Sequence, residues 1–193
     1  MAQKLDPQGE KLRELAVDLK IIQLRIKSLQ GAELSSQAKA YVVEIRKVNP
    51  SCVIIMNDHI SLAEELKLEG VHLGQSDDSV IKARTILGPH SFIGLTVRSL
   101  DEVGEAAKLI REGTIDYIGS GTVFETTTKQ GLSVKGPGFI EQVQKRISTE
   151  KIYPIGGITV ENIELLKAIG VKHVALCSEL FRNTKKNLKA LTI

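Results

Sequence analysis

The stretch from Gly119 to Gly131, GSGTVFETTTKQG, places three threonine hydroxyls and the Lys129 ammonium group side by side. An apolar, strand-like run precedes these groups, and glycines stand on both sides of them. So many hydrogen-bonding groups in so few residues indicate a loop at a ligand site rather than a simple connection. The question is which other residues the fold brings to the same place.

Cationic and polar side chains alternate at the end of the first β-branched run. In QLRIK, the residues Gln23, Arg25 and Lys27 are two positions apart, so on a strand they point to the same face. In a parallel barrel that face is the interior, whereas on an edge strand the same pattern forms a solvated surface. We favour the interior because isoleucine and leucine occupy the positions around them.

Two later apolar runs end in acidic residues. VIIMND ends in Asn57 and Asp58, and VHLGQ is followed by Asp77. Carboxylates at the ends of neighbouring strands offer the hard oxygen ligands that suit Mg²⁺ with a phosphate group. The alternative is that each aspartate caps the helix after it. We favour a basic, metal-assisted anion site, because the acids would lie opposite Arg25 and Lys27, and Lys129 would add a cation.

A second anion site is predicted at the last two runs. IYPIGG ends in Gly156 and Gly157, just before a helix expected to begin near Thr159, and glycines let backbone N–H groups approach a ligand. The final run, HVALCS, ends in Cys177 and Ser178 and also leads into a helix. Helix N-termini favour anions, and TIM barrels commonly bind phosphate at their late strands. These residues therefore predict a monophosphate cradle.

The elements that would position these residues are apolar runs that alternate with amphipathic helical segments. The runs lie at 21–26, 53–58, 71–75, 91–96, 115–124, 152–157 and 173–178. They are apolar nearly throughout, as expected for parallel strands covered on both faces. The expected helix N-caps are Ser61, Ser99 and Thr159. The expected C-cap glycines are Gly70, Gly88, Gly113 and Gly170.

This alternation predicts an α/β fold, specifically a TIM (β/α)₈ barrel formed as a single domain over residues 1–193. A helical segment at residues 7–20 precedes the first clear strand, so the barrel's first strand must be a shortened MAQKL or must be missing. An open doubly wound sheet is the alternative. We favour the barrel because no G-x-G-x-x-G turn follows the first strand.

The composition excludes several other classes of protein. The 193 residues are 42% hydrophobic and 25% charged, which is ordinary for a soluble globular chain. A net charge of +3 falls short of a nucleic-acid-binding stripe, and no apolar run approaches the roughly 20 residues of a membrane span. The polar N-terminus and the distant Cys52 and Cys177 predict a cytoplasmic protein with reduced thiols. A homo-oligomer is compatible with the sequence, which does not fix the oligomeric state.

From Gln23 to Leu180, the chain resembles the thiamin phosphate synthase family. The resemblance rests, in order, on QLRIK, MNDHISLAEELKLEGVHLGQSD, DYIGSGTVFETTTK, PIGGIT and VALCSEL. It implies a transferase that joins a hydroxymethylpyrimidine diphosphate to a thiazole phosphate, forming thiamin monophosphate and releasing pyrophosphate. Cations and metal would then stabilise the charge that develops on the leaving pyrophosphate, and no strong general base is needed.

The resemblance also divides the candidate residues by ligand. The pyrimidine is expected to face Gln23, and Mg²⁺ is expected to bind Asp58 and Asp77. The diphosphate is expected to bind the catalytic residues Arg25, Lys27, Asn57 and Lys129. The thiazole phosphate is expected to bind Thr126, Thr128, Gly156, Gly157, Cys177 and Ser178. Thr96, counted among the catalytic and substrate-binding residues, supplies a hydroxyl where a serine is usual.

Two departures from the family pattern and two rival functions remain. Glu125 stands where proline is common, beside the expected diphosphate site, and the first strand is worn down. One rival is the family's thiazole tautomerase paralogue, which binds thiazole phosphate without diphosphate chemistry and tends to lack the paired acids. The other is a non-catalytic phosphate-binding barrel. The presence of both Asp58 and Asp77 favours the synthase.

Overall fold

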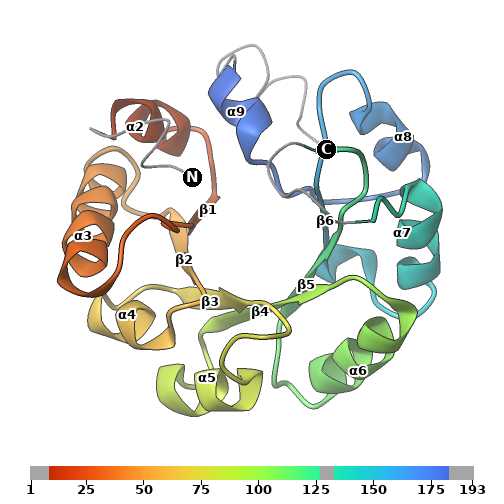
Figure 1. Ribbon diagram of the computed structural model, residues 1–193, viewed down its shortest axis with the longest axis horizontal. Coiled ribbons are helices and arrows are strands. Elements are labelled where there is room, and N and C mark those ends of the chain that lie inside the picture. Colours follow the sequence, from red (N-terminus) through yellow and green to blue (C-terminus); the bar gives the residue numbers. More distant parts are fainter. Residues whose placement is uncertain (1–8, 127–132, 183–193) are drawn as a thin grey trace. The chain divides into compact units, whose positions relative to one another are not determined.

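The computed structural model describes residues 9–126 and 133–182, which form two compact units of parallel strands and helices (Figure 1). The first unit contains the described chain up to Leu73 together with Asp77–Ile93. The second contains Gly74–Ser76 and the described chain from Gly94 onward. Among the helices of these residues, none is both long enough and apolar enough to cross a membrane.

Strands and helices alternate in the first unit, and its strands pair in chain order. Ile21 lies beside Val53, and Ile55 lies beside Gly70, both in parallel register. The elements, in order, are α2 (Glu10–Ala16), β1 (Ile21–Leu24), α3 (Gly31–Val48), β2 (Val53–Asn57), α4 (Ile60–Glu65), β3 (Gly70–Leu73) and α5 (Val80–Leu87).

Helix α3 supplies much of the core of the first unit. Its buried residues are Leu34, Ala38, Tyr41 and Ile45, whose spacing of three or four residues places them along one face of the helix. Tyr41 is only 1% exposed. The helix pattern in the sequence therefore translates directly into a packed face.

An ion pair joins α3 to the starts of β2 and β3. The guanidinium of Arg46 contacts Glu69 through Nη2, and its Nη1 donates to the carbonyl groups of Cys52 and Pro50. The other carboxylate oxygen of Glu69 accepts the backbone N–H of Ile54 at 2.7 Å. This network lies at the amino-terminal ends of the strands, the end that serves stability rather than catalysis in folds of this class.

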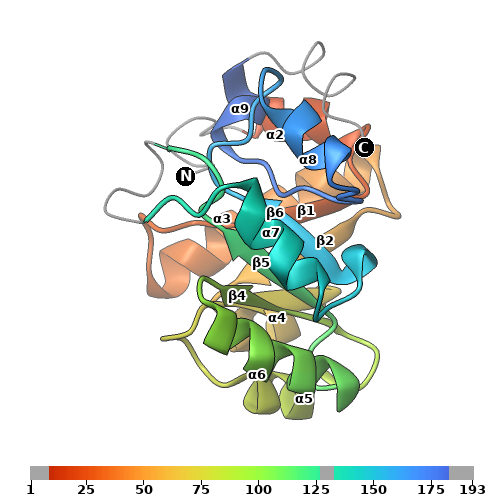
Figure 2. The ribbon, with the colours of Figure 1, turned by 90° about the vertical axis from the view of Figure 1, so that its right-hand side faces the viewer.

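The second unit continues the same alternation. Gly94 lies beside Tyr117, and Ile118 lies beside Ile152, again in parallel register. Helix α7 packs against β6, as Figure 2 shows. The elements are β4 (Phe92–Val97), whose first two residues belong to the first unit, α6 (Leu100–Arg111), β5 (Tyr117–Gly121), α7 (Pro137–Gln144), η1 (Thr149–Lys151), β6 (Ile152–Ile155), α8 (Ile163–Ala168) and α9 (Ser178–Arg182).

Within the described residues, six of the seven predicted runs form parallel strands, which confirms the α/β prediction. The seventh predicted strand, at 173–178, is represented by a single bridge between Ile155 and Ala175, and α9 already begins at Ser178. The segment MAQKL lies outside the described residues.

The helix ends agree with the sequence in part. Ser99 caps α6 by accepting the N–H of Glu102, and Gly88, Gly113 and Gly170 have positive φ angles, as predicted. Three predictions are wrong. Thr159 does not cap α8 (Ile163–Ala168), whose N-cap is Asn162. Ser61 lies inside α4, whose N-cap is His59. Gly70 is the first residue of β3, where an added Cβ would lie 1.9 Å from the carbonyl oxygen of Phe92, so close backbone packing explains this glycine.

Three aromatic side chains form a row of ring contacts in the second unit. Tyr117 and Tyr153 meet edge to face with their centroids 5.1 Å apart, and Tyr153 lies nearly parallel to His173 at 5.0 Å. Burial raises the pKa of Tyr153 above its ordinary value. The stack joins the starts of β5 and β6 to the segment that follows α8.

Candidate active site

The alternation at the end of β1 is present in the structure. Gln23 and Lys27 are exposed and Arg25 is half-buried, whereas the residues between them are buried. Only Gln23 lies within β1; Arg25 and Lys27 follow its last residue, Leu24, and continue the same alternation of exposure. Asn57 ends β2 and lies beside His72 of β3, and both side chains are nearly buried.

Asp58 directly follows β2 and places a carboxylate at the carboxyl-terminal end of this strand. Its backbone has a φ of 68° and donates to the carbonyl of His72 at 2.9 Å, so the residue is fixed to the neighbouring strand. Lys27 Nζ forms an ion pair with Asp58 Oδ2. Burial raises the pKa of Asp58, but the hydrogen bond from Lys27 and the nearby positive charges outweigh it, so the pKa lies below its ordinary value.

The side chain of Asp77 lies close enough to that of Asp58 to affect its pKa, so the two predicted metal ligands are neighbours. Neither acts as a helix cap. Helix α4 has His59 at its N-cap, and α5 is capped by Ser79, whose hydroxyl accepts the N–H of Lys82 at 3.1 Å. The capping alternative is therefore wrong for both aspartates, and their pairing needs another explanation.

In the second unit, Thr96 lies on β4 beside Gly119 of β5. The side-chain amide of Gln75 donates to the backbone carbonyl of Thr96 at 2.7 Å. Gln75 was visible in the sequence as a polar residue after a strand but received no role there. Only the fold brings its side chain to the end of β4.

The glycine turn after β6 differs from the predicted cradle. Helix α8 begins at Ile163, four residues later than expected, so its N-terminus does not directly follow the glycines. Instead, the side chain of Asn162 donates to the carbonyl of Gly157 at 2.8 Å and accepts the N–H of Thr159 at 2.9 Å. Sequence reasoning missed Asn162, whose only signal was an amide one turn after the glycines.

Both glycines are required by contacts with the segment that follows β5. Gly156 and Gly157 have φ angles of 104° and 66°. An added Cβ on Gly156 would lie 2.6 Å from Thr122 Cγ2, and one on Gly157 would lie 2.2 Å from the carbonyl oxygen of Glu125. The backbone of Glu125 therefore packs on the glycine turn, while its residue as a whole is exposed.

The threonine-rich loop is described only at its two ends. The carbonyl groups of Thr122 and Val123 accept the N–H groups of Lys135 at 2.8 Å and Gly136 at 3.0 Å, which pairs the two ends of the loop. Thr126 is half-buried. The predicted residues Thr128 and Lys129 lie outside the described residues. Cys177 and Ser178 are half-buried at the start of α9.

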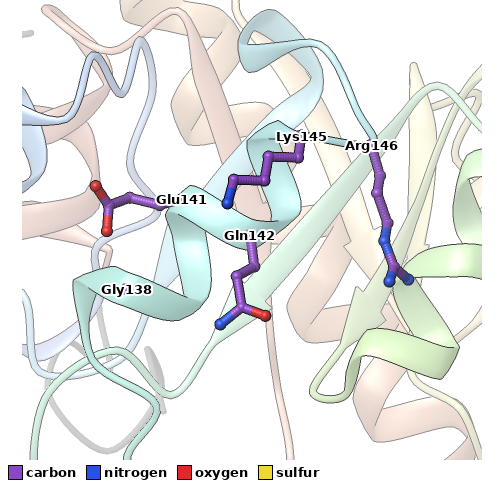
Figure 3. Close-up of a pocket in the computed structure, with 5 residues that line it drawn as sticks. All are labelled: Gly138, Glu141, Gln142, Lys145 and Arg146. Carbon is purple, nitrogen blue, oxygen red and sulfur yellow. The ribbon is translucent and has the colours of Figure 1, made fainter.

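A separate hollow of about 500 Å³ lies on the outer side of α7 (Figure 3). Gly138, Glu141, Gln142, Lys145 and Arg146 line it, and Arg146 Nη1 also donates to the carbonyl of Leu100 at 2.7 Å. No predicted site residue contributes to it. Its position on a helix surface, away from the strand ends, argues against it as the catalytic site.

Asp58 and Asp77 fit the Mg²⁺ ion predicted for this site. Their side chains are neighbours, and the lowered pKa of Asp58 keeps that carboxylate ionised, so hard oxygen donors are present. Within the described ranges, no group of three or more acidic, histidine or cysteine side chains could hold a metal. Two carboxylates are the usual protein contribution where Mg²⁺ keeps waters and binds phosphate oxygens.

Parallel strands with polar and charged side chains at their carboxyl-terminal ends define an α/β enzyme of the class that carries its site at that end. More specifically, the chain belongs to the thiamine monophosphate synthase family, whose model matches residues 9–180. The predicted family and the transferase class are thereby confirmed.

Individual relatives agree with this assignment. The chain is 35% identical to thiamine-phosphate synthase of Persephonella marina over 89% of its own length and 79% of the relative's. It is 38% identical to thiamine-phosphate synthase of Fusobacterium nucleatum, with 83% and 74% covered. The structure resembles thiamine phosphate pyrophosphorylase from Pyrococcus furiosus with a TM-score of 0.80 and 26% identity, covering 98% of this chain and 89% of the other.

Proposed function

We propose that this chain is a thiamine-phosphate synthase that joins a hydroxymethylpyrimidine diphosphate to a thiazole phosphate. The observation that carries the proposal is the Asp58–Asp77 pair at the end of β2 and β3, with Lys27 on Asp58. Two acidic side chains and one cationic side chain near the ends of neighbouring strands suit a diphosphate bound with a metal ion. Family membership supports the same reaction.

The reaction breaks the bond between the pyrimidine methylene carbon and a diphosphate oxygen, and the electron pair leaves with pyrophosphate. The thiazole nitrogen then forms the new bond to that carbon. Negative charge develops on the leaving group and positive charge on the methylene, so the protein must stabilise an anion rather than remove a proton. The cationic side chains of the first unit suit this task.

In the first unit, Arg25, Lys27 and Asn57 would hold the diphosphate, and Gln23 would face the pyrimidine. These residues share the end of β1 and β2, and Arg25 and Asn57 are partly or nearly buried, which limits their rotation. Asp58 and Asp77 would hold Mg²⁺, which neutralises charge on pyrophosphate oxygens when it is bound.

In the second unit, Thr96, Thr126 and the backbone at Gly156 and Gly157 would bind the thiazole phosphate, with Cys177 and Ser178 completing the site. Asn162 holds the carbonyl of Gly157 and thereby fixes the turn. Thr128 and Lys129 are proposed to act from the loop with the family's roles. Mg²⁺, these two substrates and a cytoplasmic location stay predictions.

The decisive assay supplies purified protein with both substrates and Mg²⁺ and measures released pyrophosphate. We expect Asp77→Asn to reduce release by about a hundredfold or more, because a metal ligand is lost. Asp78→Asn is the matched control, since Asp78 is exposed and pairs with Lys82 at 3.0 Å. Its activity should stay within about twofold of the wild type.

The same experiment separates the rival functions. A tautomerase paralogue would convert thiazole phosphate without releasing pyrophosphate, and a binding protein would do neither. Wild-type protein that releases no pyrophosphate would overturn the synthase proposal. Equal loss in Asp77→Asn and Asp78→Asn would remove the metal role from Asp77.

We also propose that the six strands belong to a single-domain TIM (β/α)₈ barrel. The parallel pairing in chain order and the bridge from Ile155 to Ala175 support this proposal. A crystal structure in which residues 173–178 do not pair beyond that bridge and the sheet stays open would contradict it.

A further inference from the structure

One carboxylate in the first unit has two proposed partners. Lys27 Nζ contacts Asp58 Oδ2, while Asp58 is one of the two residues that fit a metal ion. A divalent cation bound at Asp58 would lie within a few ångströms of the lysine ammonium, and the two positive charges would repel each other. Metal binding at Asp58 therefore favours the departure of Lys27 from the carboxylate.

The two partners differ in their freedom to move. The Asp58 side chain is 17% exposed, and its backbone is bound to His72 by a hydrogen bond of 2.9 Å. The Lys27 side chain is 51% exposed and is attached through a flexible four-carbon chain. The carboxylate therefore stays in place, and the ammonium group is the mobile member of the pair.

The same lysine is a proposed ligand of the diphosphate. When a metal ion arrives together with a diphosphate, the displaced ammonium gains phosphate oxygens in exchange for the carboxylate. When the metal ion arrives alone, Lys27 loses its partner and gains none. The ion pair therefore penalises a bare cation and not a metal–diphosphate complex.

We propose that Lys27 is a displaceable counter-ion that makes this site accept a divalent cation together with a diphosphate rather than alone. The proposal rests on the function proposed above and adds the order in which charge enters the site. Coupling of this kind is reciprocal, so the metal must strengthen diphosphate binding by the same factor as the diphosphate strengthens metal binding. We expect Lys27 to account for part of this mutual strengthening of metal and diphosphate binding.

The test measures binding to the purified full chain without turnover. Mn²⁺ affinity is measured by the electron paramagnetic resonance of unbound Mn²⁺, and pyrophosphate affinity is measured by calorimetry with and without Mg²⁺. In Lys27→Met, we expect the Kd for Mn²⁺ alone to fall by about threefold to fivefold, the range of a partly exposed ion pair. The gain in pyrophosphate affinity on adding Mg²⁺ should shrink.

Two variants serve as controls. Lys82→Met removes the lysine of the neighbouring exposed pair with Asp78, and should leave both affinities unchanged. Asp58→Asn should abolish the Mn²⁺ signal if that signal comes from this site. Circular dichroism shows whether each variant is folded.

Mn²⁺ binding that is equal in wild type and Lys27→Met, or too weak to detect in both, overturns the proposal. Weaker Mn²⁺ binding in Lys27→Met also overturns the proposal, because removal of a competing cation should strengthen Mn²⁺ binding. A misfolded or damaged site would lose affinity for both Mn²⁺ and pyrophosphate. Wild-type protein that makes thiamin monophosphate while Lys27→Met shows no gain in Mn²⁺ affinity would refute the counter-ion role alone. A wild type without pyrophosphate release would refute the function itself.

Discussion

Removing the carboxylate of Glu69 should weaken the first unit more than its partly exposed position suggests. Glu69 accepts the backbone N–H of Ile54, a residue with 0% exposure, and pairs with Arg46. A buried N–H without an acceptor costs about 1–3 kcal/mol. The ion pair, about one third exposed, adds about 1 kcal/mol or less. Together these terms predict a loss of about 1–4 kcal/mol for Glu69→Ala.

The measurement is equilibrium unfolding in urea. With a typical slope of about 2 kcal/mol per molar, a loss of about 3 kcal/mol lowers the midpoint by about 1.5 M. Glu69→Gln retains an acceptor for Ile54 and should lose only about 1 kcal/mol. Glu64→Ala, at an exposed position of α4, is the control and should stay within about 0.5 kcal/mol of the wild type. If Glu69→Ala is as mild as Glu64→Ala, the network does not stabilise the unit.

Three further predictions concern the strand ends. The pKa of Asp58 is lowered in the folded protein, so the ionised carboxylate contributes fully to the free energy of unfolding above pH about 4. This contribution is lost as the pH falls through the pKa of the folded state. The difference in unfolding free energy between wild type and Asp58→Asn should therefore shrink on acid titration. Gly157→Ala should lower the Tm by about 4–8 °C more than Gly113→Ala, because its Cβ would lie 2.2 Å from the Glu125 carbonyl oxygen, whereas Gly113 has a similar φ but open space around it. Equal shifts in Tm would contradict a steric cause. Gln75→Met removes the hydrogen bond to the backbone carbonyl of Thr96 in β4, which is worth about 1 kcal/mol. The KM for a substrate should rise about fivefold, and kcat should stay nearly unchanged. An unchanged KM would show that Gln75 has no positioning role.

Local periodicity predicted the parts of this chain that depend on neighbouring residues. The period of two predicted the alternation of exposure at Gln23, Arg25 and Lys27, although β1 itself ends at Leu24. The apolar runs located six strands for the same reason. The carboxyl-end rule for parallel strands then predicted that Asp58 and Asp77 are neighbours, and the effect of Asp77 on the pKa of Asp58 agrees with that prediction.

Features that depend on contacts between distant segments could not be predicted. Gly70 looks like a helix cap in the sequence, yet its reason is the Phe92 carbonyl, more than twenty residues away. The Arg46–Glu69 pair joins a helix to a strand start, and neither residue stands out by type or spacing. Helix α8 starts late, after a turn in which the Asn162 side chain binds the Gly157 carbonyl and the Thr159 N–H, and neither contact is visible in the sequence.

The distribution of tyrosines gives the chain its own optical probes. The sequence contains no tryptophan and three tyrosines. Tyr41 is buried in the first unit, whereas Tyr117 and Tyr153 form an edge-to-face pair in the second. Intrinsic fluorescence therefore arises from tyrosine alone, and replacing Tyr41 with phenylalanine leaves an emission that reports only on the second unit. Comparing the unfolding curves of the two proteins would reveal whether the units melt in one cooperative step or in succession.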